Sequence, residues 1–168
     1  MIERFSKPAA GGIIEKNVDG IDYILIQERS KEDAKLEEGL LEIPAGKIRE
    51  FENIYECLRR EIWEETGLQV TEIDGEKDST IFESNRYKVL NYTPFACSQN
   101  IEGNYPVMVE TFICKVKGEM LAKTNETKNI RWISLKDLKE LIVKDKNRFY
   151  PMHIKTLEKY IDMKSKAL

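Results

Sequence analysis

Histidine is almost absent from this chain of 168 residues, since His153 is the only one. Zinc sites in proteins are built mainly from histidine and cysteine. The three cysteines, Cys57, Cys97 and Cys114, show no CxxC spacing and offer no thiolate cage. A metal site in this protein therefore has to be made of oxygen ligands, which favours Mg²⁺ or Mn²⁺.

The chain also lacks the signals of a secreted or membrane protein. Its odd number of scattered cysteines does not indicate a disulfide framework and favours a reducing compartment. No apolar run approaches the ~20 residues needed to cross a bilayer. The N-terminal stretch MIERFSKPAAGGII has no basic segment followed by an apolar one, as a signal peptide would have. We therefore expect a cytoplasmic protein that does not bind membranes.

The chain also lacks a strongly positive net charge. The 27 lysines and arginines are outnumbered by 30 acidic residues, which gives a net charge of −3, and no basic run stands out. A nucleic-acid polymer is therefore not an expected partner, whereas a small phosphate ligand neutralised by a metal ion is compatible with this charge. The length and the 41% hydrophobic content predict one domain, residues 1–168, with a sizeable core.

The order of predicted elements indicates an α+β fold with a mixed sheet and helices packed on its faces. β-Branched apolar runs separated by turn residues predict strands, and apolar residues at spacings of three and four predict helices. No GxGxxG follows a strand, which disfavours a dinucleotide-binding Rossmann domain. The predicted strands are 9–16, 21–29, a short one in 40–48 broken at Pro44, two or three in 68–96, 105–116 and 129–134; the predicted helices are 52–65, one capped by Ser134 and one opened by Pro151.

The helix at 52–65 carries carboxylates at the end where a helix disfavours them. Gly67 is a typical helix stop, and Glu61, Glu64 and Glu65 occupy the two turns before it. The C-terminal end of a helix is partly negative, so each acidic residue there costs roughly 0.3–1 kcal/mol. These three acids share an arc of roughly 100° on one helix face, beside the apolar stripe. A solvated acidic face is one interpretation; a bound cation is the other, and it would remove the conflict.

Neighbouring residues could complete such a site. Arg60 could hold one carboxylate in a bidentate pair, and Glu52 lies near the helix start, where the dipole favours an acid. Upstream, Gly46 is predicted to end a turn whose backbone carbonyl could offer a further oxygen.

The segment GKIREFENIYECLRREIWEETGL, residues 46–68, resembles the Nudix box, G-x5-E-x7-R-E-U-x-E-E-x-G-U, in which U is aliphatic. The order of strands and helices around it also resembles the α/β/α sandwich of the Nudix family. All nine defined positions of the box match: Gly46, Glu52, Arg60, Glu61, Ile62, Glu64, Glu65, Gly67 and Leu68.

The resemblance implies a Mg²⁺- or Mn²⁺-dependent hydrolase that cleaves a nucleoside diphosphate linked to another moiety, with a small-molecule nucleotide as its partner. It implies that Glu64, Glu65 and the carbonyl of Gly46 are metal ligands. Clustered divalent ions can neutralise the oxygens of a pyrophosphate linkage and help to deprotonate a water near pH 7.

The same resemblance implies roles for three other residues of the box. Glu61 is implied to be either a metal ligand or the base that activates water. Arg60 and Glu52 are implied to orient the carboxylates.

Outside the box, the resemblance suggests three further residues. MutT-like enzymes carry a glutamate six residues before a tryptophan, and Glu126 has this spacing to Trp132. ADP-ribose pyrophosphatases place the corresponding acid on a loop between later strands, where this chain has Glu102. Arg29, at the end of the second predicted strand, resembles a basic residue that contacts substrate phosphates in relatives. A surface charge is the alternative interpretation of each residue.

Two features of the sequence favour different substrates. EIPAGKI, residues 42–48, resembles the approach to the box in ADP-ribose and sugar-nucleotide pyrophosphatases, whereas MutT-like enzymes more often have FPGGK. Only 45 residues precede Gly46, too few for the extension through which typical ADP-ribose pyrophosphatases dimerise, so a homodimer is left open. ADP-ribose or a nucleotide sugar is the first expectation, and an (oxidised) nucleoside triphosphate or dinucleoside polyphosphate is the alternative.

A non-catalytic nucleotide-binding Nudix domain is the alternative of another class. Binding-only relatives tend to lose glutamates of the box, and this chain keeps all of them. Aromatic side chains, among them Tyr105 and Tyr150, could stack on a base, but a core position is the preferred interpretation of each. The stretch RFYPMH, residues 148–153, contains the only histidine and could border the pocket, but the turn that leads into the last helix is the preferred interpretation.

Overall fold

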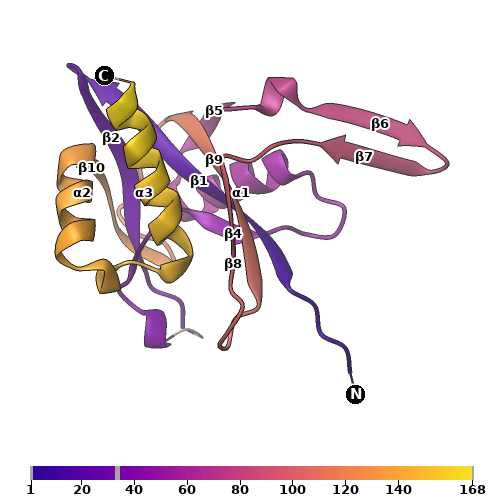
Figure 1. Ribbon diagram of the computed structural model, residues 1–168, viewed down its shortest axis with the longest axis horizontal. Coiled ribbons are helices and arrows are strands. Elements are labelled where there is room, and N and C mark those ends of the chain that lie inside the picture. The colour runs from indigo at the N-terminus through magenta and orange to yellow at the C-terminus, as the bar shows by residue number, and fades with distance from the viewer. Residues whose placement is uncertain (1, 33–34, 168) are drawn as a thin grey trace.

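The computed structural model describes residues 2–32 and 35–167. Its central feature is an eight-stranded mixed sheet with the main order β10-β2-β1-β9-β5, in which β3 pairs with β2, β4 with β1, and β8 with β9 (Figure 1). The β1–β9 pair is parallel and the other pairs are antiparallel. The strands of this sheet are β1 (Lys7–Val18), β2 (Ile21–Arg29), β3 (Leu41–Glu42), β4 (Ala45–Lys47), β5 (Gln69–Ile73), β8 (Ala96–Gln99), β9 (Val107–Lys117) and β10 (Thr127–Ser134).

Helices cover both faces of the sheet, so the predicted α/β/α sandwich with a mixed sheet is confirmed. Successive side chains of a strand point to opposite faces, and neighbouring strand residues belong to different cores. Ile14 and Leu25 pack with α1, whereas Ile13 and Ile24 pack with α2 and α3. The helices are α1 (Ile54–Thr66), α2 (Leu135–Lys144) and α3 (Pro151–Lys166), with short 3₁₀ turns η1 (Lys35–Glu37), η2 (Glu76–Asp78) and η3 (Lys146–Arg148).

Helix α1 is fixed at both ends by local hydrogen bonds. The side chain of Asn53 accepts from the backbone N–H of Tyr55 and forms the N-cap. At the other end Gly67 adopts the left-handed conformation, with φ 76°, and its N–H donates to the carbonyl of Trp63. The helix therefore begins two residues later than predicted, and Glu52 lies just before it.

The starts predicted for the last two helices are confirmed. Ser134 caps α2 by accepting a hydrogen bond from the backbone N–H of Asp137 at 3.1 Å. Pro151 is the first residue of α3, where its missing N–H costs nothing.

Two details of the predicted strands are wrong. Gly46 does not end a turn; it lies within β4 and pairs with Ala10 of β1. The strand β8 was not predicted, since its sequence, ACSQ, has little of the β-branched character that identifies the other strands. It forms because β9 offers an edge with which it pairs antiparallel.

The region 68–96 contains β5 and a separate hairpin of β6 (Thr80–Ser84) and β7 (Tyr87–Asn91). Asn85 and Arg86 form its tight turn with positive φ angles. The hairpin is a two-stranded sheet of its own and projects away from the main sheet (Figure 1).

The sheet brings distant parts of the box region together. β4 pairs with β1, which lies between β2 and β9, and α1 packs over β1, β4 and β5. As a result the last turns of α1, the end of β2 and the segment before β10 surround one region. Among the described residues, no helix is long and apolar enough to cross a membrane.

Candidate active site

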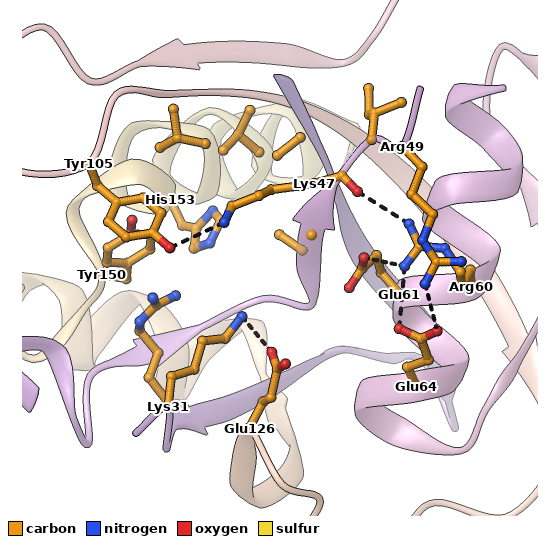
Figure 2. A pocket seen from close by; sticks show the side chains of 17 residues that line it. Lys31, Lys47, Arg49, Arg60, Glu61, Glu64, Tyr105, Glu126, Tyr150 and His153 are labelled. Carbon is orange, nitrogen blue, oxygen red and sulfur yellow. Dashed lines mark hydrogen bonds and ion pairs between the residues drawn. The ribbon is translucent and has the colours of Figure 1, made fainter. Parts of the chain in front are cut away.

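A cavity of about 400 Å³ opens beside the C-terminal half of α1 (Figure 2). Residues of β1, β2, β4, α1, β9 and the start of α3 line it. Acidic and basic side chains of the Nudix-like segment form one side, and three ring-bearing side chains, Tyr105, Tyr150 and His153, lie on the other. Sequence reasoning placed all three in the core or in a turn.

Glu65 is the most deeply buried acid of the box, with only 3% of its surface exposed. Its Oε2 accepts hydrogen bonds from Gln27 Nε2 at 2.8 Å and from the backbone N–H of Ala45 at 3.2 Å. Among the described residues its Oε1 has no hydrogen-bond partner, and Lys31 Nζ lies 3.8 Å away. Burial, followed by the nearby carboxylate of Glu42, raises the pKa of Glu65 to about 8. A buried oxygen without a hydrogen-bond partner is unusual, and a divalent cation is a ligand that would satisfy it.

Arg60 holds three carboxylates at once. Its Nε and Nη2 donate to the two oxygens of Glu52 at 2.7 and 2.9 Å, and its Nη1 donates to Glu61 and, at 3.3 Å, to Glu64. The hydrogen bonds from Arg60 lower the pKa of Glu52 to about 2. The charges at the end of α1 are thus partly neutralised by the protein itself. This position supports the orienting role expected for Arg60 and Glu52.

Glu61 and Gly46 are in close contact. A Cβ atom on Gly46 would lie only 1.9–2.3 Å from the carboxyl atoms of Glu61, so no other residue fits there without displacing that carboxyl group. The glycine is explained by this close approach, since Gly46 itself is part of an extended strand. Burial raises the pKa of Glu61 above its ordinary value, although Arg60 opposes the shift.

Four acids border the same region. Glu61, Glu64 and Glu126 line the cavity and also a second hollow of about 350 Å³, which Glu65 borders as well. Glu64 is partly exposed, and Glu126 forms an ion pair with Lys31 at 2.7 Å. Within the described parts of the chain no group of three such side chains is already arranged as a metal cage. Arg60 and Lys31 hold these acids instead, while the donor set, all oxygen, is the one that suits Mg²⁺.

The two residues expected to contact substrate lie in different surroundings. Arg29 lines the cavity, but it is paired with Glu42 at 2.5 Å and Glu37 at 2.8 Å, and its guanidinium stacks on Tyr150 at 4.1 Å. Glu102 is exposed on the segment between β8 and β9 and is not among the residues that line the cavity. The structure therefore brings Glu126, and not Glu102, to the acids of α1.

Sequence reasoning missed several polar residues that support the site. Gln27 and Glu42 are buried side by side in β2 and β3, and both belong to the network around Glu65. The available signal was an amide inside the apolar run YILIQER, because a buried polar side chain needs a specific partner. Lys31 and Lys47 also line the cavity, but nothing distinguishes them in sequence from other surface lysines.

Comparison with known proteins agrees with this geometry. The family description "NUDIX domain" matches residues 6–153. Three solved structures share the fold: a MutT protein from Methanosarcina mazei (21% identity, 99% of both chains, TM-score 0.60), an Ap4A hydrolase from C. elegans (16%, 95% of this chain and 98% of that one, 0.59) and the NUDIX domain of Shewanella oneidensis NrtR complexed with ADP ribose (12%, 96% and 90%, 0.65). No curated protein matches the sequence.

The chain therefore belongs to the Nudix family. It is a hydrolase that acts on pyrophosphate bonds. Members of this family bind small nucleotide substrates and generally use divalent metal ions.

Arg60→Ala is expected to impair both activity and stability. Removing the guanidinium frees Glu52 and Glu61 from their common partner and leaves poorly solvated carboxylates close together. We expect turnover to fall by about 10²-fold, because a small displacement of an aligned group costs that much, and the free energy of unfolding to fall by about 1–3 kcal/mol.

Arg59→Ala is the matched control. Arg59 forms a bidentate ion pair with Glu76, away from the cavity, and is 38% exposed. Its loss should change the free energy of unfolding by less than about 1 kcal/mol and leave turnover unchanged. Denaturant titration and initial rates measure both quantities, and equal behaviour of the two variants would contradict the role of Arg60.

His153 should make the protein sensitive to acid. Burial, with a contribution from Arg29, lowers the pKa of its imidazole to about 3, whereas the unfolded chain titrates near 6.5. Between these values the unfolded state binds a proton that the folded state does not, so stability is lost as the pH falls from 6.5 towards 3. Each pH unit in this window corresponds to about 1.4 kcal/mol.

Urea denaturation of wild type and His153→Gln at pH 7 and pH 5 measures this contribution. The carboxylates titrate alike in both proteins, so the difference between the two pH dependences isolates the imidazole. We expect the variant to lose less stability on acidification; an identical loss would show that His153 is protonated in the folded protein.

Proposed function

We propose that residues 1–168 form one domain that hydrolyses, with Mg²⁺ or Mn²⁺, the pyrophosphate linkage of a nucleoside diphosphate joined to another moiety. ADP-ribose or a nucleotide sugar is the substrate class that we favour. The proposed metal dependence rests on Oε1 of Glu65, which is buried and has no hydrogen-bond partner among the described residues. Glu65 borders the same hollow as Glu61 and Glu64. The stretch EIPAG, residues 42–46, supports the substrate class, because it resembles the approach to the box in ADP-ribose and sugar-nucleotide pyrophosphatases.

The protein's own residues have separate tasks in this proposal. Glu64, Glu65 and the carbonyl of Gly46 would hold the metal, which would supply positive charge to the phosphate oxygens and favour deprotonation of a water. Glu61 accepts the proton of the attacking water or holds the metal, and its elevated pKa suits a proton acceptor. Arg60 and Glu52 keep these carboxylates in place.

A nucleoside triphosphate, including an oxidised one, or a dinucleoside polyphosphate is the second candidate. The position of Glu126 favours it: this glutamate, which has the spacing found in MutT-like enzymes, borders the hollow with the box acids, whereas Glu102 does not. A non-catalytic nucleotide-binding domain is the third candidate, and the retention of Glu61, Glu64 and Glu65 opposes it.

A substrate panel separates these candidates. Release of product is measured with ADP-ribose, nucleotide sugars, dinucleoside polyphosphates and nucleoside triphosphates, each with Mg²⁺, with Mn²⁺ and with a chelator. We expect turnover to require a divalent ion and to be fastest with ADP-ribose or a nucleotide sugar. Fastest turnover of a triphosphate would favour the second candidate, and no turnover of any compound would favour the third.

Millimolar Mg²⁺ should raise the melting temperature of the wild-type protein. A ligand that binds only the folded state stabilises it by about 2.7 kcal/mol at a hundredfold excess over Kd. Glu64→Gln removes one charge from the C-terminal end of α1, so it should slightly stabilise the metal-free protein and lose most of the response to Mg²⁺.

Glu56→Gln is the control, because Glu56 is exposed in the first turn of the same helix. It should keep the full response to Mg²⁺. The measurement is thermal melting of the three proteins with chelator and with Mg²⁺. If Glu64→Gln responds as strongly as wild type, the cation binds elsewhere.

A further inference from the structure

The cavity has an end that the proposed hydrolysis does not use. Figure 2 shows Tyr105, Tyr150 and His153 together on one side and Arg60 and Glu61 on the other. The side that carries the three rings differs from the acidic side in its packing and its hydrogen bonding.

This end has an apolar wall. Ala9, Val107 and Val109 form a small buried cluster, separate from the two main cores, against which Tyr105 and Met152 pack. The same three small residues and Tyr105 line the cavity. The wall can therefore contact the flat, apolar face of a ligand.

His153 provides an unsatisfied polar group at the same end. The residue is only 1% exposed, and among the described residues its Nδ1 has no hydrogen-bond partner. Its edge-to-face contact with Tyr150, at 5.5 Å between ring centroids, holds the ring without satisfying a nitrogen. A buried polar atom without a partner is costly and calls for an explanation. Because the imidazole is neutral near pH 7, it offers one donor and one acceptor, and no charge.

Two cationic side chains border this end, and they differ in their partners. Arg29 is neutralised by Glu37 and Glu42. The Nζ of Lys47 has no carboxylate partner among the described residues; it lies 3.3 Å from the hydroxyl of Tyr105 and 5.2 Å from the centroid of its ring (Figure 2). A phosphate thus fits near Lys47, whereas the apolar wall and the neutral imidazole of His153 suit an uncharged group of the same ligand.

We propose that the end of the cavity formed by Tyr105, Tyr150 and His153 binds the nucleobase of the ligand, and that His153 determines base preference by hydrogen bonding to the edge of the base. A nucleobase combines an apolar face with a polar edge, which matches an apolar wall beside an unpaired imidazole. The inference rests on the proposed function in so far as the ligand is a nucleotide.

The single histidine allows a direct test on the wild-type protein. Protein labelled with ¹⁵N-histidine is titrated, in the presence of Mg²⁺, with AMP, GMP, CMP, UMP and ribose 5-phosphate, and the imidazole ¹⁵N resonances are recorded. None of these compounds contains a pyrophosphate bond, so the test does not depend on turnover. We expect saturable imidazole shifts with at least one nucleotide and none with ribose 5-phosphate, which lacks a base. Unmoved resonances with all four nucleotides, or equal shifts with ribose 5-phosphate, would overturn the proposal.

Variants supply the second measurement. In His153→Ala, Kd for the preferred nucleotide should rise about tenfold, or about 1.4 kcal/mol, with Kd for ribose 5-phosphate unchanged. His153→Asn keeps an uncharged donor and acceptor and should regain part of the affinity. Lys155→Ala, at an exposed position of α3, should bind as wild type does.

An equal loss of affinity for both ligands in His153→Ala would show a structural role and overturn the proposal. Should that variant fail to fold, His153→Asn and the imidazole titration decide. Base-dependent imidazole shifts without turnover of any compound in the substrate panel would overturn the proposed hydrolysis and support the base subsite.

Discussion

The site depends on the burial of one carboxylate, that of Glu65. Its position in the last turn of α1 is set by Gly67, which ends the helix, and by the packing of α1 on the sheet. Gln27 of β2 and the backbone of Ala45 in β4 each donate a hydrogen bond to one oxygen. These contacts connect the helix to two strands and leave the other oxygen without a hydrogen-bond partner in the part of the chain that the structure describes. The packing that stabilises the fold therefore also creates the unsatisfied oxygen.

The two ends of the cavity therefore differ in chemical character. The acids of α1 and Glu126 lie at one end of the cavity, and an apolar wall with aromatic rings lies at the other. Arg60 neutralises the first end internally, which explains how several carboxylates tolerate a helix C-terminus in the absence of a ligand. Arg60 thus reduces the unfavourable effect of carboxylates at the C-terminal end of the helix before any cation binds.

The fold can be predicted from the sequence, and so can the segment that carries the acids, for physical reasons that are local. The apolar periodicity, Ser134 as a cap and Gly67 as a helix stop act within a few residues, and spacing alone reveals the box. The surroundings of the acids depend on contacts between distant segments. Gln27 meets Glu65 only through the packing of α1 on β2, and His153 reaches the cavity only because α3 begins beside it. Gly46 was predicted as a turn residue because its contact with the side chain of Glu61 cannot be read from sequence.

The parallel pairing of β1 with β9 has a consequence for how the protein folds. Lys7 pairs with Val107 and Gly11 with Thr111, so the pairing joins residues one hundred positions apart. Such non-local contacts form slowly, because a long loop must close before they contribute any stability. β4 and α1 dock on β1, and the apolar wall of the cavity contains residues of both β1 and β9. During refolding, the complete cavity can therefore form only after the slow step of loop closure, whereas the local hairpin β6–β7 can form without it.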